Sequence, residues 1–272
     1  MKGIALGQYY PANSLLHKLD PRIKLILTIL YIVCSFLCKN VFSYALLLLS
    51  AVLLIAIGRV PLKIILKGLK PVLFVLVFTA VLNIFWTNGE TPLVEWYFIK
   101  IYKEGIYSAL FIIIRIAALI IGTGMFLTYT TTPIALTNAI EDLLAPLKLL
   151  HVPVHSFAMM MTIALRFIPT LAEETDRIMT AQKARGADFS SGGLISRAKA
   201  LIPVLVPLFV SAFNRAGDLA TAMECRCYNG GEGKTRMTVR RLKVWDFIPL
   251  VLILAFGTAL VLFNIYGIGY TM

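Results

Sequence analysis

Five long apolar stretches dominate this sequence and set the class of fold that it can adopt. They cover approximately residues 23–39, 41–58, 70–88, 106–130 and 246–269. About 20 residues of helix cross the hydrocarbon core of a bilayer, so each stretch is long enough to span a membrane. The composition agrees, since 59% of the 272 residues are hydrophobic and only 15% are charged, whereas roughly a quarter of a soluble domain is charged. The sequence therefore predicts an all-α integral membrane protein with about five transmembrane helices.

The basic residues predict how these helices are oriented. Most of the 26 lysines and arginines fall before the first stretch, between the second and third stretches, or between residues 148 and 243. Because cytoplasmic loops are enriched in Lys and Arg, the amino terminus is expected inside and the carboxyl terminus outside. The first stretch is the weakest, since Arg22, Lys24 and Lys39 must extend their charged ends to the membrane surface. The net charge of +12 is thus assigned to topology and to anionic lipid head groups, and nucleic-acid binding is not expected.

Residues 131–244 differ in character from the apolar stretches. Prolines at positions 133, 146, 153, 169, 203 and 207 interrupt them, and an interior proline removes a helix hydrogen bond. We expect short amphipathic helices here, with segments 154–172 and 201–213 lying on the membrane surface, partly embedded in it, or on a partner. The predicted organisation is an amino-terminal membrane domain over 1–130, a cytoplasmic-side region over 131–244 and a final transmembrane helix within 245–272.

A short arginine motif occurs twice in this middle region. Each arginine lies near the end of an expected helix with small residues beside it, so the helix end could enter a groove closely. The guanidinium could then form paired hydrogen bonds with a carboxylate of another protein. Two such ends suggest two grooves on a two-part partner, although a chance pair of surface arginines satisfies the same spacing. The candidate contact residues are Ala184, Arg185, Gly186, Cys225, Arg226 and Cys227.

The sequence contains no group of residues typical of a catalytic or metal site. The segment Tyr228–Thr235 resembles a phosphate-binding loop, but Tyr228 replaces the first glycine and no apolar strand precedes it. The spacing of Cys225 and Cys227 is tighter than that of structural zinc ligands, with only His151 and His155 as distant candidates. The acidic residues around Glu174 are expected to form intrahelical pairs on a solvated face. We therefore expect no bound cofactor or metal and no catalysis by this chain.

Arg115 is an exception inside the fourth apolar stretch. It is flanked by isoleucine and alanine in the segment 112–118, and a charge within the membrane must find a partner or water. Two interpretations stay open. Arg115 makes a polar contact with another helix or subunit, or it is an arginine deep in the helix bundle whose charge extends to the surface.

Four blocks of the sequence resemble the transmembrane T component of energy-coupling factor (ECF) transporters, which import vitamins and metal ions. The opening block, residues 7–24, is similar to the start of that family, and residues 167–177 are similar to the lead into its first coupling motif. Ala184-Arg185-Gly186 matches that motif, and residues 222–228 are similar to the second. The second motif departs from the family where alanine and glycine are common, because Cys225 and Cys227 stand there. Asn229-Gly230 is expected to end that helix instead.

The resemblance implies a noncatalytic coupling subunit that is a multi-pass protein of a prokaryotic cell membrane. Such a protein holds two ABC-type ATPases through Arg185 and Arg226, and the ATPases use ATP and Mg²⁺. It also holds a substrate-binding membrane (S) component, for which Met159, Met160 and Met161 are candidate contacts. The resemblance is to the module type that serves several S components, and the substrate is not encoded in this chain. The alternative is a stand-alone membrane enzyme acting on a lipid or isoprenoid, against which the lack of an acidic or histidine cluster argues.

Overall fold

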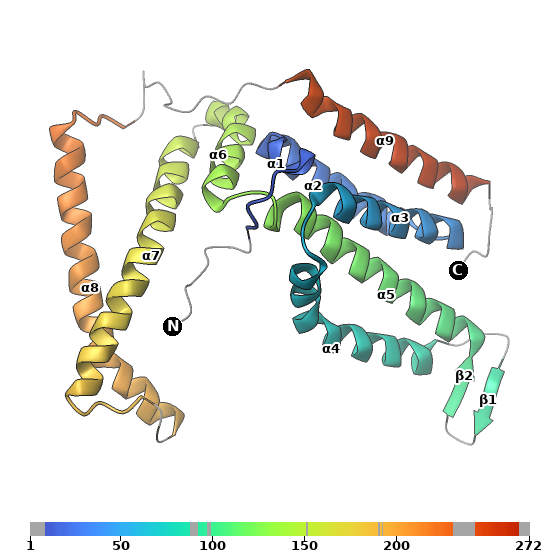
Figure 1. Cartoon of the computed structure of the whole chain (residues 1–272), viewed down its shortest axis with the longest axis horizontal. Helices are drawn as coiled ribbons and strands as arrows, with labels where there is room; N and C mark the ends of the chain where they lie inside the picture. Colours follow the sequence, from blue (N-terminus) through green and yellow to red (C-terminus); the bar gives the residue numbers. More distant parts are fainter. Residues whose placement is uncertain are drawn as a thin grey trace. The chain divides into compact units, whose positions relative to one another are not determined.

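The computed structural model describes residues 9–87, 92–96, 99–150, 152–189, 191, 193–230 and 243–266. The chain forms two compact units (Figure 1). Gly7–Thr132 and Arg240–Met272 make up the first, here called the bundle unit, and Pro133–Val239 make up the second, here called the crossing unit.

The bundle unit is built almost entirely of helices. They are α1 (Leu15–Lys18), α2 (Pro21–Leu37), α3 (Val41–Gly58), α4 (Leu62–Trp86), α5 (Lys103–Thr123) with its π-helical continuation η1 (Gly124–Thr128), and α9 (Val244–Ile265). A short antiparallel hairpin of β1 (Pro92–Trp96) and β2 (Ile99–Tyr102) lies between α4 and α5. This hairpin was not predicted from the sequence.

Helix α2 begins where the sequence provides two start signals and then supplies much of the core. The Asp20 carboxylate accepts a hydrogen bond from the Arg22 backbone N–H at 2.9 Å, and Pro21 occupies the first helical position, where it has no hydrogen bond to lose. Leu27 and Tyr31 on its buried face are 1% and 2% exposed. The Tyr31 ring lies against Gly122 of α5 so closely that a Cβ there would be 2.1 Å from it. The contact between α2 and α5 therefore requires glycine.

Lys24 is buried rather than extended to the membrane surface, which corrects the expectation for this residue. Its side chain is 1% exposed, and its ammonium donates to the carbonyl of Thr130 at 2.9 Å and to the hydroxyls of Thr130 and Thr131 at 3.2 and 3.3 Å. A buried charge is tolerated where oxygen acceptors surround it. Lys24 thereby ties the start of α2 to the segment that follows η1.

The crossing unit contains two helices longer than the short helices predicted for this region. Its elements are α6 (Pro133–Leu143), the 3₁₀ helix η2 (Ala145–Leu150), α7 (Val154–Ala184) and α8 (Leu194–Cys225). Pro169 lies inside α7, and Pro203 and Pro207 lie inside α8. The prediction of short helices is corrected because each proline removes one hydrogen bond and bends the helix without ending it. Figure 1 shows the resulting change of direction along α8.

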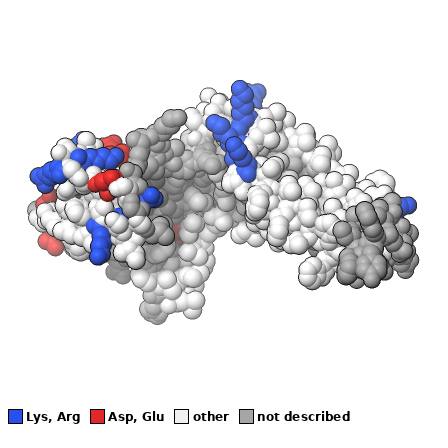
Figure 2. Space-filling view, turned by 90° about the horizontal axis from the view of Figure 1, so that it is seen from below, with Lys and Arg blue, Asp and Glu red and all other residues white. Residues whose placement is uncertain are grey.

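Six helices among the described residues are long and apolar enough to cross a membrane. They are α3, α4, α5 with η1, α7, α8 and α9, so the prediction of an all-α membrane protein with about five spans is confirmed. Helix α2 has 17 residues and matches the first predicted stretch, the weakest of the five. On the face drawn in Figure 2, the bundle unit is mostly uncharged and most of its basic side chains lie together, whereas the crossing unit carries basic and acidic side chains intermixed.

Candidate coupling surface

The first arginine motif forms the end of α7. Arg185 is the capping residue, and Gly186 has a φ of +88°, in the left-handed region that glycine adopts without steric cost. The amide of Gly186 donates to the carbonyl of Lys183 at 3.0 Å, and the amide of Ala187 donates to that of Gln182 at 3.0 Å. These two bonds define a Schellman motif, which satisfies carbonyls at a helix end. The prediction that Gly186 ends this helix is confirmed.

The second motif ends α8 in the same way. Arg226 is the capping residue, and Cys227 takes the left-handed position with a φ of +55°. Its amide donates to the carbonyl of Glu224 at 2.9 Å, and the amide of Tyr228 donates to that of Met223 at 3.0 Å. The expectation that Asn229-Gly230 would end the helix is therefore wrong, since Cys227 itself does so. Gly230 also has a positive φ, of +83°, but lies three residues further on.

The two arginines consequently occupy equivalent positions, one at the cap of each helix. Arg185 and Arg226 are both exposed. Neither guanidinium has a hydrogen bond or ion pair to another residue in the described part of the chain. The small neighbours Ala184 and Cys225 are exposed as well. Each helix therefore ends in an accessible guanidinium with little side-chain bulk beside it.

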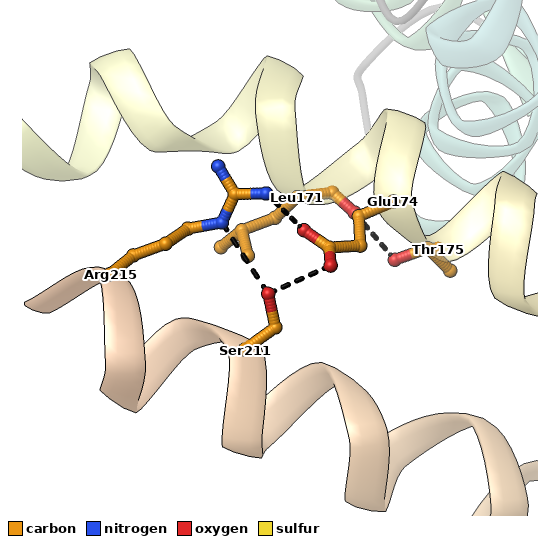
Figure 3. A network of polar contacts seen from close by, with 5 residues as sticks. All are labelled: Leu171, Glu174, Thr175, Ser211 and Arg215. Atoms are coloured by element: carbon orange, nitrogen blue, oxygen red, sulfur yellow. Dashed lines mark hydrogen bonds and ion pairs between the residues drawn. The ribbon is translucent and has the colours of Figure 1, made fainter.

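A polar cluster joins α7 to α8 between these ends (Figure 3). The Glu174 carboxylate of α7 accepts a hydrogen bond from the Ser211 hydroxyl at 2.7 Å and from the Arg215 guanidinium at 2.5 Å, both on α8. Arg215 Nε also lies 3.4 Å from the Ser211 hydroxyl, to which it donates. This contact was not predicted from the sequence, because the acidic residues around Glu174 were expected to form intrahelical pairs. Ser211 and Arg215, one helical turn apart, were the available signal.

The cluster lies at the same distance from the terminal arginine along each helix. The α7–α8 pair is antiparallel in this region, since the side chain of Gln182 also donates to the carbonyl of Pro203, at 3.4 Å. Arg185 follows Glu174 by eleven residues, and Arg226 follows Arg215 by eleven residues. At 1.5 Å per residue, each arginine lies about 16 Å along its helix from the cluster. We call Glu174–Ala184 and Arg215–Cys225 the two arms; neither contains a proline.

Comparison with known proteins establishes the family. A sequence profile for CbiQ, described as cobalt transport protein, matches residues 12–238. The chain belongs to this family. A relative from Ruminiclostridium cellulolyticum, named energy-coupling factor transporter transmembrane protein EcfT, is 54% identical over 262 residues, covering 96% of this chain and 97% of its own length. Proteins of the same name from Clostridium kluyveri and Bacillus subtilis are 51% and 49% identical, over 91% and 90% of this chain and 92% and 91% of theirs.

The resemblance to ECF T components is thus confirmed, and the chain is a multi-pass protein of a bacterial cell membrane. The predicted contact residues for the S component are also partly accessible in this chain. Met160 and Met161 are 57% and 41% exposed, and Met159 is half-buried. They follow the start of α7, where His155 contacts Glu141 of α6 at 3.0 Å. The three methionines therefore belong to an accessible apolar surface of the crossing unit.

No group of metal-binding side chains occurs among the described residues of this family member. His155 contacts Glu141, and His151 lies outside the described residues. Cys225 and Cys227 are free thiols and exposed. Of the segment that resembles a phosphate-binding loop, only Tyr228–Gly230 is described.

Arg115 contacts other helices of the same chain. Its guanidinium donates to the backbone carbonyl of Cys38 at 2.9 Å and to the hydroxyl of Tyr44, and it lies 5.4 Å from the centre of the Tyr44 ring. Arg115 thus joins α5 to the end of α2 and to α3. Of the two interpretations left open above, the geometry favours the polar contact with a neighbouring helix.

Proposed function

We propose that this EcfT-family chain is the noncatalytic subunit that couples ATP hydrolysis by two cytoplasmic ATPase subunits to movement of a membrane-embedded S component. The observation that carries the proposal is the matched pair of helix ends, each with an exposed, unpaired arginine among the described residues at its cap. Two equivalent ends suit two related ATPase subunits. The resulting assembly would import a vitamin or other micronutrient selected by the S component.

The chemistry of each contact follows from the residues at the helix ends. A guanidinium at a helix carboxyl terminus is stabilised by the negative end of the helix dipole, and it can bind a carboxylate through two parallel hydrogen bonds. Ala184 and Gly186, or Cys225 and Cys227, leave room for the walls of a groove around the arginine. Lysine would replace this planar pair of bonds with a point charge. The contact is therefore specific for arginine and for an acidic groove.

The arms give the contacts a route to the rest of the protein. Each arm is an uninterrupted helix between its arginine and the Glu174–Arg215 cluster. A displacement at one helix end is transmitted along the arm rather than absorbed in a loop. The methionines at 159–161, of which Met160 and Met161 are exposed, offer an adaptable surface for the S component. ATP and Mg²⁺ chemistry belongs to the ATPase subunits in this proposal, and this chain binds no cofactor.

Charge reversal tests the proposal. The variants Arg185→Glu and Arg226→Glu, singly and together, are co-expressed with the ATPase subunits and the S component. We expect each single variant to weaken co-purification of the ATPases and the double variant to abolish both co-purification and uptake. Arg197→Glu is the matched control, because Arg197 is an exposed arginine of α8 outside the arms. An intact complex with full uptake in the double variant would refute the proposal, and an active lone polypeptide would favour the membrane enzyme.

A further inference from the structure

The amino-terminal part of α4 carries basic side chains along one face and no acidic residue near them. Lys63, Lys67 and Lys70 are exposed, as is Arg59 at the end of α3. Between Asp20 and Glu90 the sequence contains no Asp or Glu, so no carboxylate of this segment can neutralise the lysines. None of the three has an ion pair or hydrogen bond to another residue among those the structure describes. Figure 2 shows a group of basic side chains on a mostly uncharged face of the bundle unit.

The spacing of the lysines makes them a single stripe. At about 100° per residue, the side chains at 63, 67 and 70 fall within roughly 60° of one another around the helix. Ile65, on the opposite side, is 3% exposed and packs with Val60 and Met125. The helix is therefore held to the bundle by one face and presents the lysine stripe on another.

Apolar side chains border the stripe. Leu62 and Leu66 are 61% and 64% exposed, and they lie about 80° and 40° around the helix from Lys70, the nearest lysine. A helix with a basic stripe beside exposed leucines is typical of segments in the membrane interface, where the leucines reach the acyl chains and the lysines meet the head groups.

Proline divides this part of α4 from the rest. Pro71 follows Lys70 directly and lies inside the helix, and Figure 1 shows α4 changing direction along its length. The remainder, Pro71–Trp86, contains no charged residue and extends about 24 Å at 1.5 Å per residue, most of the thickness of a hydrocarbon core. Charge and length therefore suit the lysine-bearing part to the head-group layer and the remainder to the acyl chains.

We propose that Lys63, Lys67 and Lys70 form a binding surface for the phosphate head groups of anionic phospholipids. Charge complementarity supports this ligand: an unneutralised basic stripe lies next to a membrane-embedded segment, where an anionic lipid supplies both a phosphate and an acyl chain. The occupant is a lipid of the leaflet that contacts the start of α4. Each lysine near an anionic surface contributes roughly a five-fold gain in binding.

Lipid retention in the full chain tests the proposal. The purified protein is reconstituted in nanodiscs of phosphatidylglycerol and phosphatidylcholine, extracted in mild detergent, and its bound lipids are counted by native mass spectrometry. We expect enrichment of phosphatidylglycerol over the bilayer ratio, and at least a ten-fold loss of that enrichment in the triple variant Lys63→Gln/Lys67→Gln/Lys70→Gln. The control is Lys183→Gln/Arg197→Gln/Lys199→Gln, which removes the same charge from exposed positions of the crossing unit and should keep the enrichment.

Retention of phosphatidylglycerol by the triple variant at the wild-type level would overturn the proposal, and so would an equal loss in the control variant. Complete displacement of the lipid by excess inorganic phosphate would also overturn it, because that result identifies a site for free phosphate. Loss of an acidic protein partner with unchanged lipid retention would assign the stripe to that partner and also count against the proposal. Helix content by circular dichroism and elution volume establish that the variants are folded.

Discussion

Exchanging the residues that end the two arms should change the stability of the two helix ends in opposite directions. The variant Gly186→Cys gives the end of α7 the residue found at the end of α8, and Cys227→Gly does the reverse. Nothing lies within 4 Å of a Cβ built at Gly186, so no clash contributes there. The effect is confined to the cost of a left-handed backbone for a residue with a side chain, about 1–2 kcal/mol.

Part of this cost is offset in the frayed state. Glycine gains more conformational freedom than other residues when the helix end opens, by roughly 0.5–1 kcal/mol. The net change is therefore about 0.5–1 kcal/mol, which corresponds to a factor of about 2–5 in the opening equilibrium. Gly186→Cys should favour opening by this factor, and Cys227→Gly should oppose it by the same factor.

Amide hydrogen exchange measures this equilibrium at the two bonds that close the helix ends. The amide of Ala187 should exchange about 2–5 times faster in Gly186→Cys, and that of Tyr228 about 2–5 times more slowly in Cys227→Gly, after correction for intrinsic rates. Both amides donate into their helices at 3.0 Å. The reasoning fails if the Tyr228 amide is unchanged or faster in Cys227→Gly, because Cys227 would then have no left-handed strain to relieve. Amides in the middle of each arm serve as the internal reference.

Three further predictions concern packing and polar contacts. Glu174→Arg should lower substrate uptake by cells several-fold, because it places two cations where α7 and α8 meet. Adding Arg215→Glu should restore most of the uptake. No recovery in the double variant would argue against a direct pair. Lys24→Met should lower the thermal transition of the purified protein, since unpaired buried acceptors cost about 1–3 kcal/mol, and an unchanged transition would contradict the burial described above. Gly122→Ala should destabilise the bundle by roughly 1–3 kcal/mol because its methyl group meets Tyr31, and a differential scanning measurement without a shift would show that the two helices can separate freely.

Hydropathy predicted the bundle unit well because burial in lipid imposes a length and a composition on every span. The stretches 41–58 and 106–130 nearly coincide with α3 and with α5 and η1. The start of α2 could also be read from Asp20 and Pro21, which act through local chemistry. The burial of Lys24 could not be predicted in this way, because it depends on distant residues. Its acceptors at Thr130 and Thr131 are more than 100 residues away, and only the folded chain brings them together.

The crossing unit shows where local signals fail. The prolines predict breaks between short helices, yet α7 and α8 continue through them, since each proline removes one hydrogen bond and bends the helix without ending it. Gly186 was predicted as a helix end because glycine favours the left-handed region. Cys227 occupies the same conformation against its own preference, and neither composition nor spacing indicates that. The pairing of Glu174 with Arg215 also depends on where the two helices meet.

The equal lengths of the two arms have a geometric consequence for any rotation about the point where the helices meet. With each arginine about 16 Å from the Glu174–Arg215 cluster, a rotation of roughly 10° carries either end through about 3 Å, the scale of a small hinge motion. Because the arms point in opposite directions from the cluster, the two displacements are equal in size and opposite in sense. Two partners that approach each other symmetrically would then change the angle between α7 and α8 without shifting their meeting point. A change in the separation of the two arginine-bearing helix ends would thereby become a change in the angle between α7 and α8 at the Glu174–Arg215 cluster.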